Sequence, residues 1–314
     1  MSLVILTKSP QFSIVSKETY KKILRLLLQK QRGPSGVTAS LLRGLSELKY
    51  KYQVNPNESE IKGASCIWVN ESIEALSWAI AHKKEGQLLV VGPNLVVSPL
   101  EHNSLICNQK INVILQPSLW TKELMENQKP ELKDKILIWP AGVQIPKQNY
   151  RQKNIDVLIF IKNQLDPSPF SRILKYLESH NLNYEIITYG RFKQKEYFNK
   201  LEHSKALLYI SDSESQGLAI QEAWARNVPT LVYNRGYYHF KKLYFESEKI
   251  SAPYLSDECG MFFTMPNFEA NFSNFFSRLK HFSPRSYVER ELSDLASAQK
   301  FINIVTRANM PEKS

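Results

Sequence analysis

Residues 211–233 of the chain read SDSESQGLAIQEAWARNVPTLVY. An apolar run, Ala206–Ile210, comes directly before this stretch and predicts a buried strand. After a polar loop, the apolar spacing predicts a helix over Gln216–Arg226, and Pro229 fits just beyond it. A second apolar run, Thr230–Tyr233, predicts the next strand. Strand, helix and strand in this order are typical of a parallel α/β layer.

The same alternation extends in both directions along the chain. Short apolar runs predict strands at Leu3–Leu6, Cys66–Val69, Leu88–Gly92, Asn112–Gln116, Ile136–Trp139, Asp156–Ile161, Tyr184–Tyr189, Ala206–Ile210 and Thr230–Tyr233. Helices are expected at Ser16–Gln31, Ser35–Leu48, Glu71–His82, Ser118–Gln128, Ser168–Ser179, Lys195–Glu202, Gln216–Arg226, Asn267–Lys280 and Arg285–Thr306. Serine is a good N-cap, and it stands at the start of three of these helices, at Ser16, Ser35 and Ser118.

The length of 314 residues favours two domains rather than one. The stretch Pro140–Lys153 has no apolar periodicity and is typical of a linker. We therefore expect two doubly wound α/β domains, at residues 1–147 and 148–284, that leave a cleft between them. Ligands of such sheets bind beyond the carboxyl ends of the strands.

Cysteine content and hydropathy favour a cytoplasmic protein. The chain has three cysteines, at Cys66, Cys107 and Cys259, with long spacings and no C-x-x-C pair. This pattern excludes a full disulfide framework and a zinc ribbon, and it fits a reducing compartment. The apolar run Leu3–Leu6 is too short for a signal peptide core or a membrane span.

The formal net charge is +11, which is compatible with nucleic acid, a membrane surface or small anionic substrates. The basic residues are scattered and form no recognised nucleic-acid motif, so we expect no nucleic-acid partner. The helix expected at Ser16–Gln31 has an apolar face bordered by lysines and an arginine. Such a helix can make a peripheral contact with the inner membrane surface, although a core-facing helix with a solvated edge is the commoner explanation.

Metal and nucleophile motifs are missing from the sequence. The six histidines show no H-x-x-x-H spacing, so we expect no metal site and no bound cofactor. No nucleophile elbow and no P-loop is present, which argues against nucleotide hydrolysis. Asp212-Ser213-Glu214 is superficially similar to a D-x-D metal motif, but the helix and second glutamate that follow favour another interpretation.

The loop before the helix at Gln216 suits an anionic ligand. The first turn of a helix leaves N–H groups unpaired, and Gly217 has no side chain to keep a phosphate from them. Glu214 would point into the cleft, and Glu222 lies about two helical turns further on. Both carboxylates can then edge one solvent-facing pocket and accept hydrogen bonds from sugar hydroxyls. The alternative is a solvated glutamate and a glutamate that stabilises the first helical turns.

The segment ESQGLAIQEAWARNVPTLV, residues 214–232, resembles the E-x7-E signature of retaining GT-B glycosyltransferases, the family 4-like group. Three further segments are similar to the same template with less specificity: IWPAGV at 138–143, QPSLWTKEL at 116–124 and RGPSGVTASLLRGL at 32–45. The resemblance implies an α/β protein of GT-B architecture, with two Rossmann-like domains facing a central cleft. It also implies that a C-terminal helix, residues 285–314, returns toward the N-terminal domain.

Roles for individual residues follow from this resemblance. It implies that Glu214 holds hydroxyls of the transferred sugar and that Glu222 binds the ribose. Amides of Gln216, Gly217 and Leu218 would bind the donor diphosphate. The segment FIKNQLDPSPF, residues 160–170, places Lys162 where the family has an arginine, and Asp166-Pro167 replaces the Lys-Gly of the family.

Other candidates follow expected strands or precede a helix. Arg235 could reach a phosphate or an acidic acceptor, or be an ordinary loop arginine. Gly190 could allow close approach of a nucleotide, or form a plain turn. Ser35 and Gly36 could form a backbone cradle for donor or acceptor, and a simple N-cap explains them equally well.

The expected activity is transfer of a sugar from a nucleotide-sugar donor, with retention of configuration and without a metal ion. The acceptor class is open between a glycan, a lipid-linked molecule and a small molecule. Because the family's Lys-Gly is replaced here, the alternative is a catalytically degenerate nucleotide-sugar binding protein.

Overall fold

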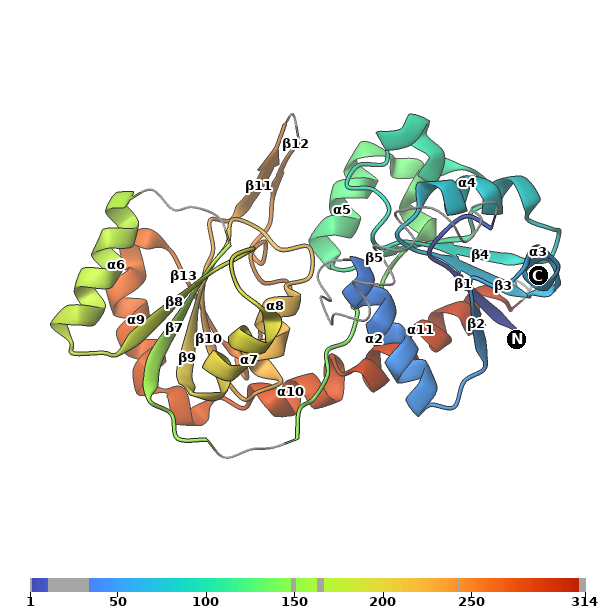
Figure 1. The fold of residues 1–314 in the computed structure, drawn as a ribbon. Coiled ribbons are helices and arrows are strands. Elements are labelled where there is room, and N and C mark those ends of the chain that lie inside the picture. The colour runs from blue at the N-terminus through green and yellow to red at the C-terminus, as the bar shows by residue number, and fades with distance from the viewer. Residues whose placement is uncertain (1, 11–33, 148–150, 163–166, 242, 311–314) are drawn as a thin grey trace. The chain divides into compact units, whose positions relative to one another are not determined.

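The computed structural model describes residues 2–10, 34–147, 151–162, 167–241 and 243–310, shown as coloured ribbon in Figure 1. The helix expected at Ser16–Gln31 and the position of Asp166 lie outside these residues. The chain divides into two compact units, Met1–Gly142 with Asp294–Ser314, and Val143–Ser293. The boundaries expected from the sequence were 147/148 and 284/285.

A six-stranded parallel sheet forms the centre of the first unit, in the order β2-β1-β3-β4-β5-β6. Its strands are β1 (Leu3–Leu6), β2 (Tyr52–Val54), β3 (Cys66–Val69), β4 (Leu88–Val91), β5 (Val113–Gln116) and β6 (Ile136–Ile138). The helices are α2 (Pro34–Glu47), α3 (Glu58–Gly63), α4 (Ile73–His82), α5 (Leu119–Gln128) and α11 (Asp294–Ala308), with 3-10 turns η1 (Glu101–Cys107) and η2 (Pro130–Lys135).

Strands β1, β3, β4 and β5 are buried along their whole length, because helices cover both faces of a parallel sheet. On one face, α4 packs its buried side chains on alternate residues of β1, β3 and β4. On the other face, the Trp68 ring packs edge-on against Phe301 of α11 at a centroid distance of 5.4 Å. Helix α11 also approaches α2 closely, since a Cβ placed on Gly44 would lie 2.1 Å from the Asp294 carbonyl oxygen.

A five-stranded parallel sheet, ordered β13-β10-β9-β7-β8, forms the second unit. Its strands are β7 (Ile155–Ile161), β8 (Tyr184–Thr188), β9 (Ser204–Ile210), β10 (Thr230–Tyr233) and β13 (Gly260–Phe263). Helices α6 (Pro167–Ser179) and α9 (Phe268–Ser277) cover one face, and α7 (Gln194–Glu202), α8 (Leu218–Trp224) and α10 (Pro284–Glu291) cover the other. Short 3-10 turns, η3 (Met265–Asn267) and η4 (Leu279–His281), flank α9. An antiparallel hairpin of β11 (Tyr237–Phe240) and β12 (Leu243–Glu246) extends away from this sheet (Figure 1).

All the predicted strands are confirmed to within two residues at either end, and the single C-terminal helix expected at Arg285–Thr306 is wrong. Two helices occur there, α10 and α11. They are separated where the Val143 N–H donates to the Leu292 carbonyl at 2.9 Å and Val143 bridges Ser293 in parallel. Leu292 ends α10 as its C-cap with φ −133° and ψ 11°, and the periodicity of the sequence gives no sign of this tertiary hydrogen bond. The resemblance implied that residues 285–314 return to the N-terminal domain as one helix. Only Asp294–Ser314 belongs to the first unit, whereas α10 belongs to the second.

Candidate functional site

The candidate site lies at the carboxyl ends of two neighbouring strands of the second unit. Ile161 of β7 and Ile210 of β9 are paired in register. Lys162 follows the first strand, and the loop of residues 211–217 follows the second. Because both strands are parallel, the lysine and the loop meet at one edge of the sheet.

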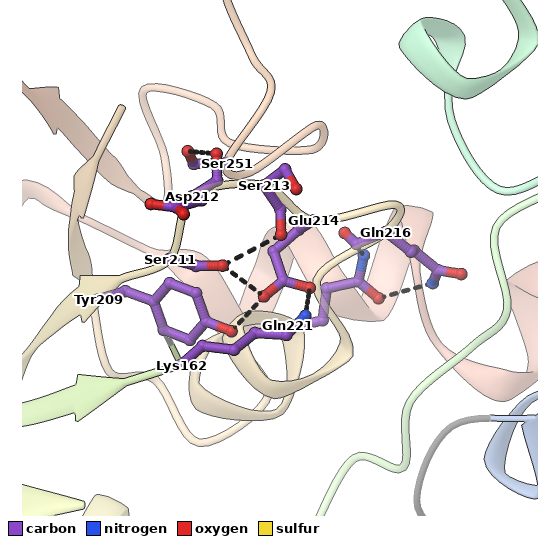
Figure 2. Close-up of polar contacts among 9 residues, drawn as sticks. All are labelled: Lys162, Tyr209, Ser211, Asp212, Ser213, Glu214, Gln216, Gln221 and Ser251. Atoms are coloured by element: carbon purple, nitrogen blue, oxygen red, sulfur yellow. Dashed lines mark hydrogen bonds and ion pairs between the residues drawn. The ribbon is translucent and has the colours of Figure 1, made fainter. Parts of the chain in front are cut away.

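Glu214 is the centre of the polar contacts at this edge (Figure 2). Its Oε2 lies 2.8 Å from the Lys162 ammonium, which donates to it. Its Oε1 accepts from the Tyr209 hydroxyl at 2.7 Å and from the Ser211 hydroxyl at 3.1 Å. The carboxylate therefore has one cationic and two neutral donors from three different positions of the chain.

Burial of Glu214 corrects the expectation that it faces a solvent-filled pocket. The residue is only 6% exposed, whereas the Lys162 side chain is 30% exposed. Tyr209, which donates to the carboxylate, is itself buried and stacks on Phe160 with centroids 4.9 Å apart. Burial and the Glu214 charge raise the pKa of Tyr209 well above its usual value, so its hydroxyl stays a donor.

Backbone contacts fix the loop that carries Glu214. The Glu214 N–H donates to the Ile250 carbonyl at 2.9 Å. The Ser251 hydroxyl donates to the Asp212 carbonyl at 3.3 Å, and the Ser211 hydroxyl contacts the Ser213 carbonyl at 3.0 Å (Figure 2). The segment after the hairpin β11–β12 therefore holds the loop in place from the opposite side to Lys162.

Helix α8 begins later than expected, at Leu218 rather than Gln216. Gly217 is its N-cap, with φ +85° in the left-handed region that favours glycine. The buried Gln216 side chain donates to Gln221 at 3.0 Å, and Gln221 donates back to the Gln216 carbonyl at 3.3 Å. This reciprocal pair ties Gln216, which precedes the N-cap, to the first turn of α8.

Glu222 lies on α8 and has its own partners. Its Oε1 accepts from the Gln194 side-chain amide of α7 at 2.7 Å. Arg226, one turn further on, stacks over the Phe198 ring at 3.5 Å and donates to the Glu222 carbonyl at 3.0 Å. Burial raises the pKa of Tyr197 well above its usual value, and the charges of both Glu222 and Glu214 add to this shift. Both carboxylates therefore disfavour the ionised form of the same buried tyrosine.

Two other candidates lie near these residues, Arg235 beside the Glu214 loop and Gly190 next to Tyr189, which lies near Lys162. Arg235 forms an ion pair with Asp212 at 3.0 Å and stacks over the Tyr237 ring at 4.0 Å. Gly190 has φ +85° in a turn after β8, closed by a hydrogen bond from Arg191 to Thr188, and the preceding Tyr189 ring lies 5.6 Å from the Lys162 ammonium.

Ser35 and Gly36 lie in the first turn of α2, in the other unit. A Cβ added to Gly36 meets no described atom within 4 Å, so local packing does not require glycine there. Over the described ranges, no cluster of three or more His, Cys, Asp or Glu side chains could hold a metal ion. Within the same ranges no helix has the length and hydropathy needed to cross a membrane.

Tyr209, Ser211 and Gln194 were missed by the sequence analysis. The signal for Tyr209 is a hydroxyl-bearing residue inside the otherwise apolar run ALLYI, immediately before the polar loop. A buried tyrosine usually finds a hydrogen-bond partner for its hydroxyl, so it indicated a polar group at this edge. Gln194 had no such signal, because only the packing of α7 on α8 brings it to Glu222.

Comparison with known proteins gives matches in structure only. No family model matches the sequence, and no curated protein sequence matches it. The lipopolysaccharide outer core galactosyltransferase WaaB superimposes with a TM-score of 0.59 at 12% identity, over 98% of this chain and 99% of that chain. Sucrose-phosphate synthase from Thermosynechococcus elongatus gives 0.56 at 8% identity, over 98% of both chains.

A chain of the GtfA/B complex gives a TM-score of 0.50 at 12% identity, over 78% of the present chain. The present chain spans only 57% of the length of that chain. These neighbours are GT-B glycosyltransferases, and the present chain has their fold, with two Rossmann-like α/β units. At identities of 8–12% the likeness establishes the fold alone.

Proposed function

We propose that the protein is a glycosyltransferase that takes a sugar from a nucleotide-sugar donor bound by the second unit. The ion pair of Lys162 and Glu214 at the carboxyl edge of the sheet carries this proposal. It sets a phosphate-binding cation beside a carboxylate that can accept sugar hydroxyls. The Gly217 turn lies next to it, and the GT-B fold supplies the context.

Each residue has a distinct task in this proposal. An ammonium has three N–H donors, so Lys162 can contact the donor diphosphate while it donates one hydrogen bond to Glu214. Amides of Gln216, Gly217 and Leu218 add neutral donors to the same phosphates. As the sugar bond breaks, negative charge grows on the diphosphate, and a fixed cation stabilises that charge.

The proposal extends to finer claims about the site and the reaction. Glu214 orients the sugar, Glu222 binds the ribose, and Arg235 and Gly190 border the nucleotide. The acceptor hydroxyl attacks on the face from which the diphosphate leaves, which retains configuration, and no metal ion is needed. The acceptor is a glycan, a lipid-linked molecule or a small molecule, and the reaction takes place in the cytoplasm or at its membrane surface.

A thermal-shift screen against nucleotide sugars tests the proposal, because a ligand that binds only the native state raises Tm. We expect at least one donor to raise Tm in the wild-type protein. Lys162→Met should abolish that shift, whereas the exposed-lysine control Lys280→Met should retain it. Shifts of equal size in all three proteins would remove Lys162 from the site, and no shift with any donor would contradict the proposed function.

The second candidate function is a nucleotide-sugar binding protein without transferase activity. Its support is that two cations at this edge are already paired with carboxylates, Lys162 with Glu214 and Arg235 with Asp212. Release of the sugar from a donor that shifts Tm distinguishes the two functions. A bound donor that is neither transferred nor hydrolysed would favour the binding protein.

A further inference from the structure

A chain of hydrogen bonds occupies the carboxyl edge of the sheet in the first unit. The Asn94 backbone N–H donates to Asn70 Oδ1 at 3.1 Å, and Asn70 Nδ2 donates to Thr38 Oγ1 at 3.1 Å. The Thr38 hydroxyl then donates to Glu71 Oε1 at 2.5 Å. Asn70 and Glu71 follow β3, Asn94 follows β4, and Thr38 lies in α2, so three elements meet here.

These three hydrogen bonds run in one direction, from the Asn94 N–H as the first donor to the Glu71 carboxylate as the last acceptor. Asn70 and Thr38 are 0% and 7% exposed, so the donors are buried, whereas Glu71 is half-buried. A carboxylate only accepts hydrogen bonds. The chain therefore holds one acceptor group in a fixed position at the edge where parallel α/β sheets bind their ligands.

The backbone at Glu71 is strained. Its φ is +74°, in the left-handed region that residues with a long side chain rarely adopt. Such conformations persist only where the surrounding structure holds them, and they concentrate at ligand sites. A glycine or an asparagine would adopt this turn more easily, so the turn alone does not call for glutamate.

Asn94 gives a second, independent observation. Its side-chain Nδ2 is buried and has no hydrogen-bond partner among the residues that the structure describes. An orphaned buried donor is rare in native proteins and needs an explanation, such as a ligand oxygen. A strong acceptor and an unsatisfied donor on the same polar edge fit a ligand group that both donates and accepts, which a hydroxyl does.

We propose that Glu71, held by Thr38 and Asn70, binds a hydroxyl group of the acceptor, and that the acceptor is a sugar. The inference rests on the proposed transferase function. A negatively charged acceptor group is disfavoured because the Glu71 carboxylate would repel it. The competing explanation is that Glu71 only stabilises the turn between β3 and α4.

The test uses the full-length protein, a donor from the thermal-shift screen, and a panel of methyl pyranosides as acceptor probes. Glu71→Gln keeps an oxygen for Thr38 but removes the charge. We expect transfer to the responsive pyranoside to fall about 10-fold or more, the loss of one charged hydrogen bond. Donor hydrolysis by water and the donor-induced rise in Tm should change less than about two-fold, because both depend on the second unit. Glu74→Gln, which changes an exposed carboxylate in the first turn of α4, should leave all three measurements unchanged.

A second variant separates binding from a structural role. Glu71→Gly relieves the left-handed backbone, so we expect Tm to stay constant or rise by about 2–4 °C while transfer is lost. A lower Tm in Glu71→Gly together with normal transfer in Glu71→Gln would overturn the proposal in favour of the structural role. A wild-type protein that hydrolyses the donor but transfers to no pyranoside would overturn the sugar assignment. Failure of the proposed function itself would look different, since no donor would raise Tm.

Discussion

The two sheet edges of this protein share a topology but differ in how they satisfy their polar groups. At the edge of the second unit, charges are matched in ion pairs, Lys162 with Glu214 and Arg235 with Asp212. At the edge of the first unit, neutral donors are lined up behind one carboxylate, Glu71. Both arrangements are built by loops that follow parallel strands.

This difference teaches that the fold specifies where ligands bind, whereas the loops specify which ligands. Cations that are already paired can keep their charge beside a buried carboxylate, and they suit an anionic donor. A chain of neutral donors ending on an acceptor suits an uncharged hydroxyl. The comparison is tested by making the same kinds of substitution at the two carboxylates, Glu214 and Glu71, and comparing their effects.

The largest effect is expected for Glu214→Ala. If Glu214 holds the reacting sugar as proposed, loss of its charged hydrogen bond should lower kcat about 10- to 100-fold. The variant should also be less stable, because the buried Tyr209 hydroxyl loses its partner and an orphaned buried donor costs about 1–3 kcal/mol. Kinetics and thermal unfolding measure the two effects separately.

Glu214→Gln separates stability from activity, since it keeps an oxygen for Tyr209 while it removes the charge. We expect Tm to recover and kcat to stay low. Glu246→Ala is the matched control, because Glu246 accepts from the Tyr244 hydroxyl at 2.6 Å on the exposed hairpin. Wild-type kcat in both Glu214 variants would remove the sugar contact from the proposed site.

A smaller effect, of a different kind, is expected for Glu222→Ala. In the proposed site Glu222 binds the ribose, which does not react, so its contacts are equal in the ground and transition states and affect mainly the donor KM. We expect a rise of about 10-fold in KM, from one lost hydrogen bond to a charged group, with little change in kcat. Gln194→Ala should give a weaker rise, because it only releases the Glu222 carboxylate from its 2.7 Å contact. A selective loss of kcat in Glu222→Ala would instead place this residue at the reacting sugar.

Sequence patterns predicted the strands of both sheets well, because buried parallel strands are continuous apolar runs such as Leu3–Leu6. They missed β13, and they missed β2 and the hairpin β11–β12 for physical reasons. Strand β2 is an edge strand with mostly exposed residues. The hairpin turn contains Lys241 at φ +55°, with none of the Gly or Asn residues that mark such turns. Helix α3 could have been found, since Asn57 and Glu60 form a capping box.

The candidate site was predictable only in part. The E-x7-E spacing indicated Glu214 and Glu222, and the strand before Lys162 indicated that this lysine lies at the same edge. Burial of Glu214 was not predictable, because it depends on tertiary contacts such as those with Tyr209 and Lys162. Glu71 was missed altogether, since its turn conformation and its bond to Thr38 are tertiary properties.

A still smaller effect is expected from removing the hydroxyl of either of two buried tyrosines, Tyr209 and Tyr197. Tyr209→Phe removes the hydroxyl that orients Glu214, and Tyr197→Phe removes a hydroxyl that donates to the Ala219 carbonyl at 2.8 Å. We expect both to lower Tm. Only Tyr209→Phe should lower kcat, by about 5-fold, which corresponds to a loss of about 1 kcal/mol from the transition state. Equal kcat in the two variants would make Tyr209 a structural residue with no effect on catalysis.

The smallest effect is expected from metal removal, where we predict no change. Divalent cations help diphosphate leaving groups by neutralising charge, and here the Lys162 ammonium and the amides of the Gly217 turn would do so instead. Transfer rates should therefore be the same in EDTA and in manganese. The prediction also has a conditional form: in Lys162→Met, added manganese should restore part of the lost rate, because a free cation can then replace the fixed one. Complete loss of wild-type activity in EDTA, restored by manganese, would show that the charge on the leaving group is neutralised by a metal. The ion pairs at this edge would then stabilise the folded structure and take no part in the reaction.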